Sequence, residues 1–330
     1  MSRAIRRGSC IYMLLTMDSH AIASALGRPG LTEQIGNTPL VSIGGLAGVP
    51  AGVQVLGKAE WFNPGGSVKD RAAWSIVRAA EAAGRFEGGR ILLDATSGNT
   101  GISYAWIGAS RGRPVLLCVP ANANRERRRL LAALGAEVIY TDPMEGTDGA
   151  IREARRLQAE DPERYVYADQ YSNPANWRAH YDTTAPEIWS QTLGRITHLV
   201  AGIGTSGTLV GAGRRLRELN PAIEVVAVQP DSPFHALEGL KHLASAMLPA
   251  FYDPTVHQRI VEVSSEQAIA MARLQARRGL LLGWSAAAAV VAAERVAQRL
   301  AAGVVVAVLC DGAERYLSEP AWDAAEEDAR

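Results

Sequence analysis

Lysine is scarce in this sequence, and one lysine, Lys69, directly follows a glycine turn in the stretch "NPGGSVKD" (63–70). The chain has 34 basic residues, of which only Lys58, Lys69 and Lys241 are lysine. Arginine stays protonated, whereas the amine of a desolvated lysine can lose its proton and condense with a carbonyl to form a Schiff base. Because a single lysine is more often a solvated surface residue, the surroundings of Lys69 decide between the two interpretations.

Two glycine-rich turns have residue types that bind anions. "ATSGNTG" (95–101) follows the apolar run "ILLD", "GIGTSGTLVG" (202–211) follows "HLVA", and each turn opens a predicted helix. The free N–H groups at a helix start and the neighbouring hydroxyls converge on an anion. Taken singly, each turn is equally compatible with tight backbone geometry alone. Neither turn has the lysine of a nucleoside triphosphate loop, and the second lacks the glycine spacing and the acidic partner of a dinucleotide site.

Together, the two turns and the lysine meet the needs of one cofactor. One turn can bind a phosphate, the other can bind the carboxylate of an amino acid, and the lysine amine can bind an aldehyde. These requirements describe pyridoxal phosphate (PLP) acting on an amino-acid substrate. The sequence therefore predicts PLP as the cofactor, with no metal site.

Short β-branched runs alternate with longer helical runs along the chain. Strands are expected over residues 53–60, 90–95, 114–120, 136–141, 197–203, 224–230 and 304–311. Helices are expected over residues 68–83, 100–111, 124–134, 207–219, 265–278 and 285–301. Apolar strands separated by helices indicate an α/β protein with parallel sheets, and the two series of elements indicate two such units. The arginine run "RERRRLLAALG" (125–135) is interpreted as a solvated helix face that ends at a glycine cap.

Composition and charge are typical of a globular protein that acts on small molecules. The chain has 330 residues, of which 48% are hydrophobic and 21% charged, and this length favours two domains. The formal net charge is zero and acidic residues are interleaved with the arginines, so we expect no nucleic-acid partner. No stretch reaches the length of a membrane span, so no membrane partner is expected. Cys10, Cys118 and Cys310 lack metal-ligand spacing and are too few for a disulfide framework, which favours a reducing cytoplasm.

Six motifs, in their order and spacing, resemble those of one enzyme family. They are "GNTPLV", "NPGGSVKDR", "TSGNTGIS", "QYSNPAN", "GIGTSGTLVG" and "DGAERYLS". From about residue 31 to residue 318, the chain resembles the cysteine synthase (O-acetylserine sulfhydrylase) and cystathionine β-synthase family, the fold type II PLP enzymes. The segment "LCDGAERYLS" is more similar to the B-type cysteine synthases than to the A-type.

The resemblance implies two three-layer α/β domains with mainly parallel, twisted sheets, a tryptophan synthase β-like fold. A large cofactor-binding domain would comprise residues 28–72 and 177–330, and a small mobile domain would comprise residues 73–176. Residues 1–27 would form an N-terminal extension that can be disordered. The family also implies a homodimer.

The same resemblance assigns cofactor roles by motif position. Lys69 would form the Schiff base with PLP, and Asn99 would bond its phenolic oxygen. Many relatives place a serine about where Gly312 stands, and glycine has no side chain to bond the ring nitrogen, so Ser285 of "GWS" is the better candidate. Ser285 can alternatively be the cap of the helix that follows it. The phosphate-binding residues would be Gly204, Thr205, Ser206, Gly207 and Thr208.

The implied activity is β-replacement on a serine derivative, with O-acetylserine as the first expectation. Lys69 would act as general base at Cα, and sulfide would add at Cβ to give L-cysteine, by way of an external aldimine and an aminoacrylate. The turn at Gly239 and the cation of Lys241 would lie near the β-substituent, and a solvated basic turn is the alternative there. The residues that bind the substrate carboxylate would be Thr96, Ser97, Thr100 and Gln170.

Other activities of the same scaffold stay open. They are those of an O-phosphoserine sulfhydrylase, a cystathionine β-synthase, a diaminopropionate synthase and a serine or threonine dehydratase. A non-catalytic, PLP-binding regulatory homologue is disfavoured, because Lys69, Asn99 and the phosphate loop are all present. The expected partners are therefore an amino-acid substrate and a sulfur donor.

Overall fold

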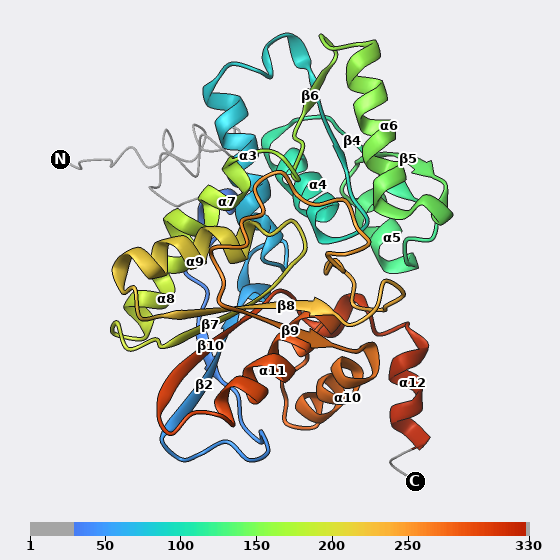
Figure 1. Cartoon of the computed structure of the whole chain (residues 1–330). Helices are drawn as coiled ribbons and strands as arrows, with labels where there is room; N and C mark the ends of the chain where they lie inside the picture. Colours follow the sequence, from blue (N-terminus) through green and yellow to red (C-terminus); the bar gives the residue numbers. More distant parts are fainter. Residues whose placement is uncertain (1–29, 328–330) are drawn as a thin grey trace, which may run out of the picture.

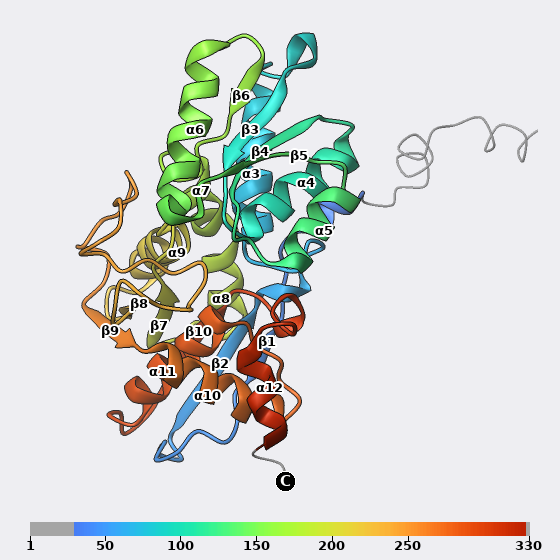
Figure 2. The ribbon, with the colours of Figure 1, turned by 90° about the vertical axis from the view of Figure 1, so that its right-hand side faces the viewer.

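The computed structural model describes residues 30–327 (Figure 1), so the predicted N-terminal extension lies outside the described residues. The described strands form two separate sheets, one above the other in Figure 2. The larger sheet has the order β1-β2-β10-β7-β8-β9, and the smaller has the order β5-β4-β3-β6. The strands are β1 (Leu40–Ser42), β2 (Val53–Ala59), β3 (Ile91–Ala95), β4 (Val115–Pro120), β5 (Glu137–Thr141), β6 (Tyr165–Tyr167), β7 (His198–Gly202), β8 (Glu224–Pro230), β9 (Arg259–Val263) and β10 (Gly303–Leu309).

Helices cover both faces of the six-stranded sheet. Strand side chains alternate between faces, so Leu199 and Ala201 of β7 pack with α9, whereas Val200 between them packs in the cluster of α10 and α11. This two-sided burial explains why the strands read as continuous apolar runs. The helices on this unit are α7 (Ala175–Ala179), α8 (Ala185–Gln191), α9 (Gly207–Leu219), α10 (Ser265–Ala276), α11 (Trp284–Ala297) and α12 (Pro320–Glu327).

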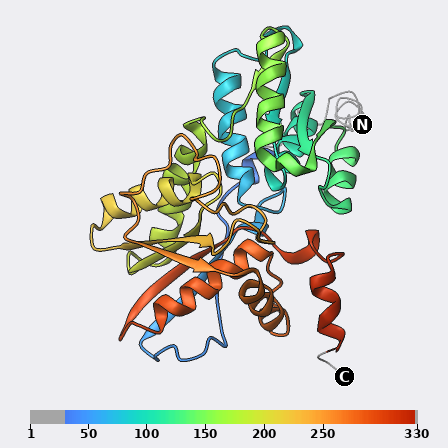
Figure 3. The ribbon, with the colours of Figure 1, turned by 45° about the vertical axis from the view of Figure 1, so that its right-hand side comes forward.

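The four-stranded sheet is covered in the same way. Leu92 and Leu117 pack with α3 and α4, whereas Leu93 and Cys118 pack on the opposite face with α6. In Figure 3, the unit with α3 (blue) and α6 (light green) lies above the strands of the larger sheet. The helices are α3 (Lys69–Ala82), α4 (Asn99–Arg111), α5 (Arg125–Ala133) and α6 (Gly146–Glu160).

The expected α/β class and the expected strands are present, but one strand does not belong to the same sheet as the strands that follow it in the chain. β2 comes first in the chain, yet it pairs in parallel with β10, from Val53 with Gly303 to Ala59 with Leu309. The first of the expected strands therefore belongs to the sheet of the second series. β1, antiparallel to β2, was not predicted, and neither were β6, β9, α6, α7, α8 and α12. Within residues 30–327, no helix is both long and apolar enough to cross a membrane.

Candidate active site

One pocket lies at the carboxyl ends of strands from both sheets, the place where open α/β sheets bind ligands. Segments that follow β3, β6, β7 and β10 contribute to its wall, as does the first residue of α3. The structure brings together every residue that was assigned to the site, and their individual roles stay predictions. The predicted residues in the wall are Lys69, Thr96, Ser97, Asn99, Thr100, Gln170, Gly204, Thr205, Ser206, Gly207, Thr208, Gly239, Lys241 and Ser285.

Lys69 is the first residue of α3, and the turn that leads to it is fixed by hydrogen bonds. The N–H of Val68 donates to the carbonyl of Cys310 at 2.8 Å. The carboxylate of Asp70 is buried, which raises its pKa, and it accepts from the N–H of Gly65 at 2.6 Å. Asp70 also accepts from the side chains of Ser103 and Trp106. The glycine turn therefore holds Lys69 in the pocket wall.

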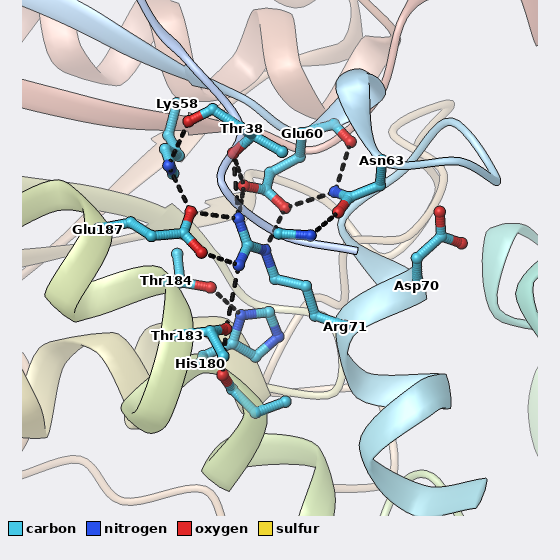
Figure 4. Close-up of polar contacts among 12 residues, drawn as sticks. Thr38, Lys58, Glu60, Asn63, Asp70, Arg71, His180, Thr183, Thr184 and Glu187 are labelled. Atoms are coloured by element: carbon cyan, nitrogen blue, oxygen red, sulfur yellow. Dashed lines mark hydrogen bonds and ion pairs between the residues drawn. The ribbon is translucent and has the colours of Figure 1, made fainter. Parts of the chain in front are cut away.

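A buried network of charges holds the start of α3 against the larger sheet (Figure 4). Arg71 donates to the two oxygens of Glu60 at 2.7 and 2.9 Å, and to both oxygens of Glu187 at 2.7 Å. Lys58 of β2 donates to Glu187 at 2.6 Å and to the carbonyl of Thr38 at 2.5 Å. Burial opposes the charge of Glu187, but the bonds and charge of Arg71 outweigh it and hold the pKa of Glu187 at about 2. The network thus joins β2, α3 and α8.

His180 lies beside this network (Figure 4), and it also contacts the predicted phosphate loop through Thr208. Its Nδ1 is 3.0 Å from the hydroxyl of Thr184, and its Nε2 is 3.3 Å from the hydroxyl of Thr208. Burial, followed by the positive charge of Arg71, lowers the pKa of His180 to about 3, so the ring is neutral at pH 7. The sequence did not single out His180, which lies in a π-helical segment, His180–Thr184. Single π-turns are frequent at functional sites.

The turn from β7 into α9 has the shape of an anion site. Ser206 is held at a left-handed φ of 69°, and its buried Oγ has no hydrogen-bond partner among the described residues. A Cβ at Gly204 would lie 2.1 Å from the carbonyl oxygen of Gly239, and one at Gly207 would lie 2.0 Å from Asn176 Oδ1. Only glycine fits at both positions, so the backbone can approach a ligand closely. An orphaned hydroxyl at a helix start suits the phosphate of PLP.

Asn99, the first residue of α4, is held at both ends of its amide. Its Nδ2 donates to Asp311 Oδ2 at 2.7 Å, and its Oδ1 accepts from the guanidinium of Arg315. A carboxylate only accepts and a guanidinium only donates, so these partners fix which end of the amide carries the N–H groups. Because Nδ2 has two N–H groups and Asp311 takes one, the other can donate to a ligand in the pocket.

The loop that opens α4 is joined to the segment after β6. Thr100 donates its hydroxyl to Gln170 Oε1 at 2.8 Å, and Gln170 Nε2 donates to the carbonyl of Ala95 at 2.7 Å. On its other side the loop reaches α6, where Thr147 donates to Ser97 Oγ at 3.2 Å. Hydroxyls and N–H groups at a helix start are suited to a carboxylate.

Ser285 lies in the pocket wall near the start of α11, but it is not the helix cap. The cap is Gly283 and the helix begins at Trp284, so the alternative role of Ser285 as the cap is wrong. Cys310, which also lines the wall, is a partly buried thiol whose pKa is raised to about 11 by loss of solvation. Ser285 therefore shares the floor of the pocket with a protonated thiol.

Lys241 is a paired cation and not a solvated one. Its side chain is 12% exposed, and Nζ lies 3.5 Å from Asp148 Oδ1. Nζ also lies 5.0 Å from the centre of the Tyr171 ring, which lines the same pocket. The alternative of a solvated basic turn does not hold at this position.

The interpretation of the arginine run as a solvated face is wrong at one residue. Gly135 follows α5 with a left-handed φ of 75°, as expected of a glycine cap, but Arg127 is buried and lines the pocket. Arg127 forms an ion pair with Glu238 and donates to the carbonyl of Ser97 at 3.2 Å. Its Cζ also lies 5.3 Å from the centre of the Tyr316 ring. Sequence reasoning missed both members of the ion pair.

The donor set of the pocket defines a class of protein. An amine at Lys69, an orphaned hydroxyl at Ser206 and a spare amide N–H at Asn99 suit a ligand that has an aldehyde, a phosphate and a ring oxygen. Within residues 30–327, no group of three or more His, Cys, Asp and Glu side chains is placed to hold a metal ion. The fold and the site are those of an α/β enzyme that uses PLP.

A family model described as pyridoxal-phosphate dependent enzyme matches residues 31–311, and the chain belongs to this family. It is 47% identical over 317 residues to the cysteine synthase of Aquifex aeolicus, covering 94% of this chain and 96% of that protein. It is 40% identical over 296 residues to the cysteine synthase B of Pseudomonas aeruginosa, covering 89% of this chain and 98% of that protein.

Two solved structures share the fold over most of their length. The cysteine synthase of Entamoeba histolytica superposes with a TM-score of 0.84 at 33% identity, covering 89% of this chain and 90% of that chain. An O-ureido-L-serine synthase superposes with a TM-score of 0.83 at 36% identity, covering 89% of this chain and 95% of that chain. The family, the α/β fold and the PLP cofactor predicted from the sequence are confirmed.

Proposed function

We propose that this protein is a cysteine synthase that exchanges the acetyl ester of O-acetyl-L-serine for sulfide. The reactants are O-acetyl-L-serine and hydrogen sulfide ion, and the products are L-cysteine and acetate. One observation carries the proposal: Lys69, the turn at 204–208 and the loop at 96–100 converge on a single pocket. The names of the most similar relatives, cysteine synthase and cysteine synthase B, support the same activity.

The pocket has a residue for each part of PLP. Lys69 would bind its aldehyde carbon, Asn99 its phenolic oxygen and Ser285 its ring nitrogen. When bound, PLP supplies an electron sink that stabilises the negative charge left at Cα of an amino acid. The phosphate would be held at the start of α9 by Gly204, Thr205, Ser206, Gly207 and Thr208.

The remaining work falls to side chains of this chain. The amine of Lys69 takes the proton from Cα of the substrate, and the acetate group leaves Cβ with the electrons of its C–O bond. After sulfide forms a bond to Cβ, the same amine returns the proton to Cα. The substrate carboxylate is held during these steps by Thr96, Ser97, Thr100 and Gln170.

The proposed boundaries of the two domains are supported by the sheets that position the carboxylate loop and the phosphate turn. The carboxylate loop lies at the carboxyl end of β3 in the four-stranded sheet, and the phosphate turn lies at the carboxyl end of β7 in the six-stranded sheet. A small mobile domain of residues 73–176 can therefore close over substrate that rests on a large domain of residues 28–72 and 177–330. Closure of this kind excludes water from the reacting atoms.

Substitution of Lys69 tests the assignment. Lys69→Ala is expected to bind PLP without the visible absorbance of the lysine-bound cofactor, and to lose at least about a hundredfold in turnover. Lys241→Ala, which changes another lysine of the same pocket, is expected to keep that absorbance. An unchanged absorbance band in Lys69→Ala would contradict the role of Lys69.

The choice of substrate is tested on the intact enzyme. The visible band is followed while O-acetylserine, O-phosphoserine and serine are added in turn without sulfide, and we expect O-acetylserine to change it at the lowest concentration. If none of the three changes the band of a protein that retains PLP, the cysteine synthase proposal fails.

We also infer a homodimer that works in the reducing cytoplasm. The dimer is supported by the family resemblance, and the compartment by the free thiols of Cys118 and Cys310. Light scattering after size exclusion is expected to give twice the chain mass. A single-chain mass throughout the micromolar range would exclude the dimer, and export in a fractionation experiment would exclude the compartment.

A further inference from the structure

Arg127 and Lys241 are two cations in the pocket wall, and each is paired with a carboxylate of the other α/β unit. Arg127 on α5 pairs with Glu238, and Lys241 lies 3.5 Å from Asp148 on α6. Glu238 and Lys241 belong to the segment between β8 and β9, drawn in orange, which rises toward the four-stranded unit in Figure 1. Each pair therefore joins the two units, and together the pairs carry no net charge.

Arg127 has the properties of an anion-binding group that is already occupied. Its side chain is 4% exposed, whereas that of Glu238 is 40% exposed. Its buried Nε has no hydrogen-bond partner among the described residues, and its Nη1 donates to the carbonyl of Ser97 in the carboxylate loop. A guanidinium remains charged and offers a planar fork that matches carboxylates and phosphates. Removal of the Glu238 charge would leave a desolvated cation at the pocket wall.

We propose that Glu238 determines the substrate class of the pocket. Glu238 neutralises Arg127. The pocket therefore selects a serine derivative with an uncharged acyl ester at Cβ and disfavours one with a phosphate ester at Cβ. A phosphate dianion would have to approach the Glu238 carboxylate or displace it from Arg127, and like charges repel each other. An acyl ester meets no such barrier. This inference rests on the proposed cysteine synthase function.

Lys241 does not replace Arg127 as a phosphate site. Its ammonium is paired with Asp148 and lies over the Tyr171 ring, and it lacks the forked geometry of a guanidinium. The selection therefore depends on the Arg127–Glu238 pair.

The test is Glu238→Gln, measured with both donors. The ratio of kcat/KM for O-phosphoserine to that for O-acetylserine is expected to rise about ten- to hundredfold, mainly through a lower KM for O-phosphoserine, because a charge-assisted bond is gained. Inorganic phosphate, titrated into the PLP-loaded enzyme by calorimetry, is expected to bind more tightly by a similar factor. Glu145→Gln makes the same charge change at an exposed pair with Arg152 and is expected to alter neither quantity.

A second substitution shows whether the gain acts through Arg127. In Glu238→Gln with Arg127→Gln, the donor ratio and the phosphate affinity are expected to return to wild-type values. If this double variant does not fold, Arg127→Lys in its place is expected to keep only part of the gain, since the charge remains and the fork is lost.

Two results would overturn the inference. An equal improvement with both donors would mean that the pair acts on the shared substrate carboxylate, and an unchanged phosphate affinity in Glu238→Gln would mean that Arg127 is not an anion site. If the wild-type enzyme used neither donor, the proposed function would fail, and the phosphate titration would still decide the role of the pair.

Discussion

Arg315 donates to the amide oxygen of Asn99 and, with the other arm of the same guanidinium, to the carbonyl oxygen of Gly65. One side chain from the segment after β10 thereby joins the start of α4 to the turn before Lys69. Asp311, on the same segment, holds the other end of the Asn99 amide. We infer that Arg315 is a positioning residue, which acts on the cofactor through Asn99 and through the turn that holds Lys69.

Replacement of Arg315 is expected to loosen this arrangement. In Arg315→Met the Asn99 amide loses a charged hydrogen-bond donor, and such a bond contributes about 1–3 kcal/mol of free energy. The affinity for PLP is therefore expected to fall about tenfold. The visible spectrum of the bound cofactor is expected to shift, because its phenolic oxygen loses an oriented partner. Equilibrium dialysis and absorbance measure the two effects. Arg125→Met, an exposed arginine on α5, serves as the control, and an unshifted spectrum in Arg315→Met would contradict the role.

His180 is expected to make the protein sensitive to mild acid. Burial holds the pKa of His180 in the folded protein at about 3, below the usual value of 6.5. Between pH 6.5 and pH 3 the unfolded chain therefore takes up a proton at this residue and the folded chain does not. The free energy of unfolding should therefore fall from pH 6.5 to pH 3, by up to ~4 kcal/mol from this residue. Urea unfolding of His180→Gln at several pH values should show a shallower decline. A slope equal to that of the wild type would refute this account.

Gly204 is expected to tolerate no side chain. A Cβ there would lie 2.1 Å from the carbonyl oxygen of Gly239, which is backbone and cannot rotate away. Gly204→Ala should therefore displace the phosphate turn, lower PLP affinity at least about tenfold and cost about 1–3 kcal/mol of unfolding free energy. Dialysis against PLP and urea unfolding check both values. Gly44→Ala, where no atom lies within 4 Å of a Cβ, should be nearly neutral; wild-type PLP affinity in Gly204→Ala would contradict the steric argument.

The parts of the site that sequence predicts are those whose geometry is local. Lys69 follows a glycine turn, Asn99 is the first residue of α4 and Ser206 is the N-cap of α9. Both helices follow an apolar strand after a short loop, so a few adjacent residues determine their placement. Ser285 is a counterexample: a cap at Ser285 requires a helix that starts at residue 286, whereas α11 starts two residues earlier, at Trp284. Helix ends are the least certain part of such predictions.

Arg127 could not be predicted in the same way, because remote residues bury it. Three other arginines stand in the same run, and its contacts with Tyr316 and Glu238 come from distant segments. One weak signal exists: Leu131 follows four residues later, and both lie on the buried face of α5. The placement of β2 beside β10 had no local signal either, since strand order depends on pairing across the whole chain.

The pairing of β2 with β10 also has a consequence for protein synthesis. The four-stranded sheet lies wholly between Ile91 and Tyr167, so the ribosome delivers all its strands together. β2 leaves the ribosome before these strands but has no parallel partner until β10 has emerged. Until then one side of this largely apolar strand lacks its partner, and an unpaired strand edge favours aggregation. The pocket wall includes Cys310 and Tyr316, so the pocket is complete only after the segment that follows β10 has been made.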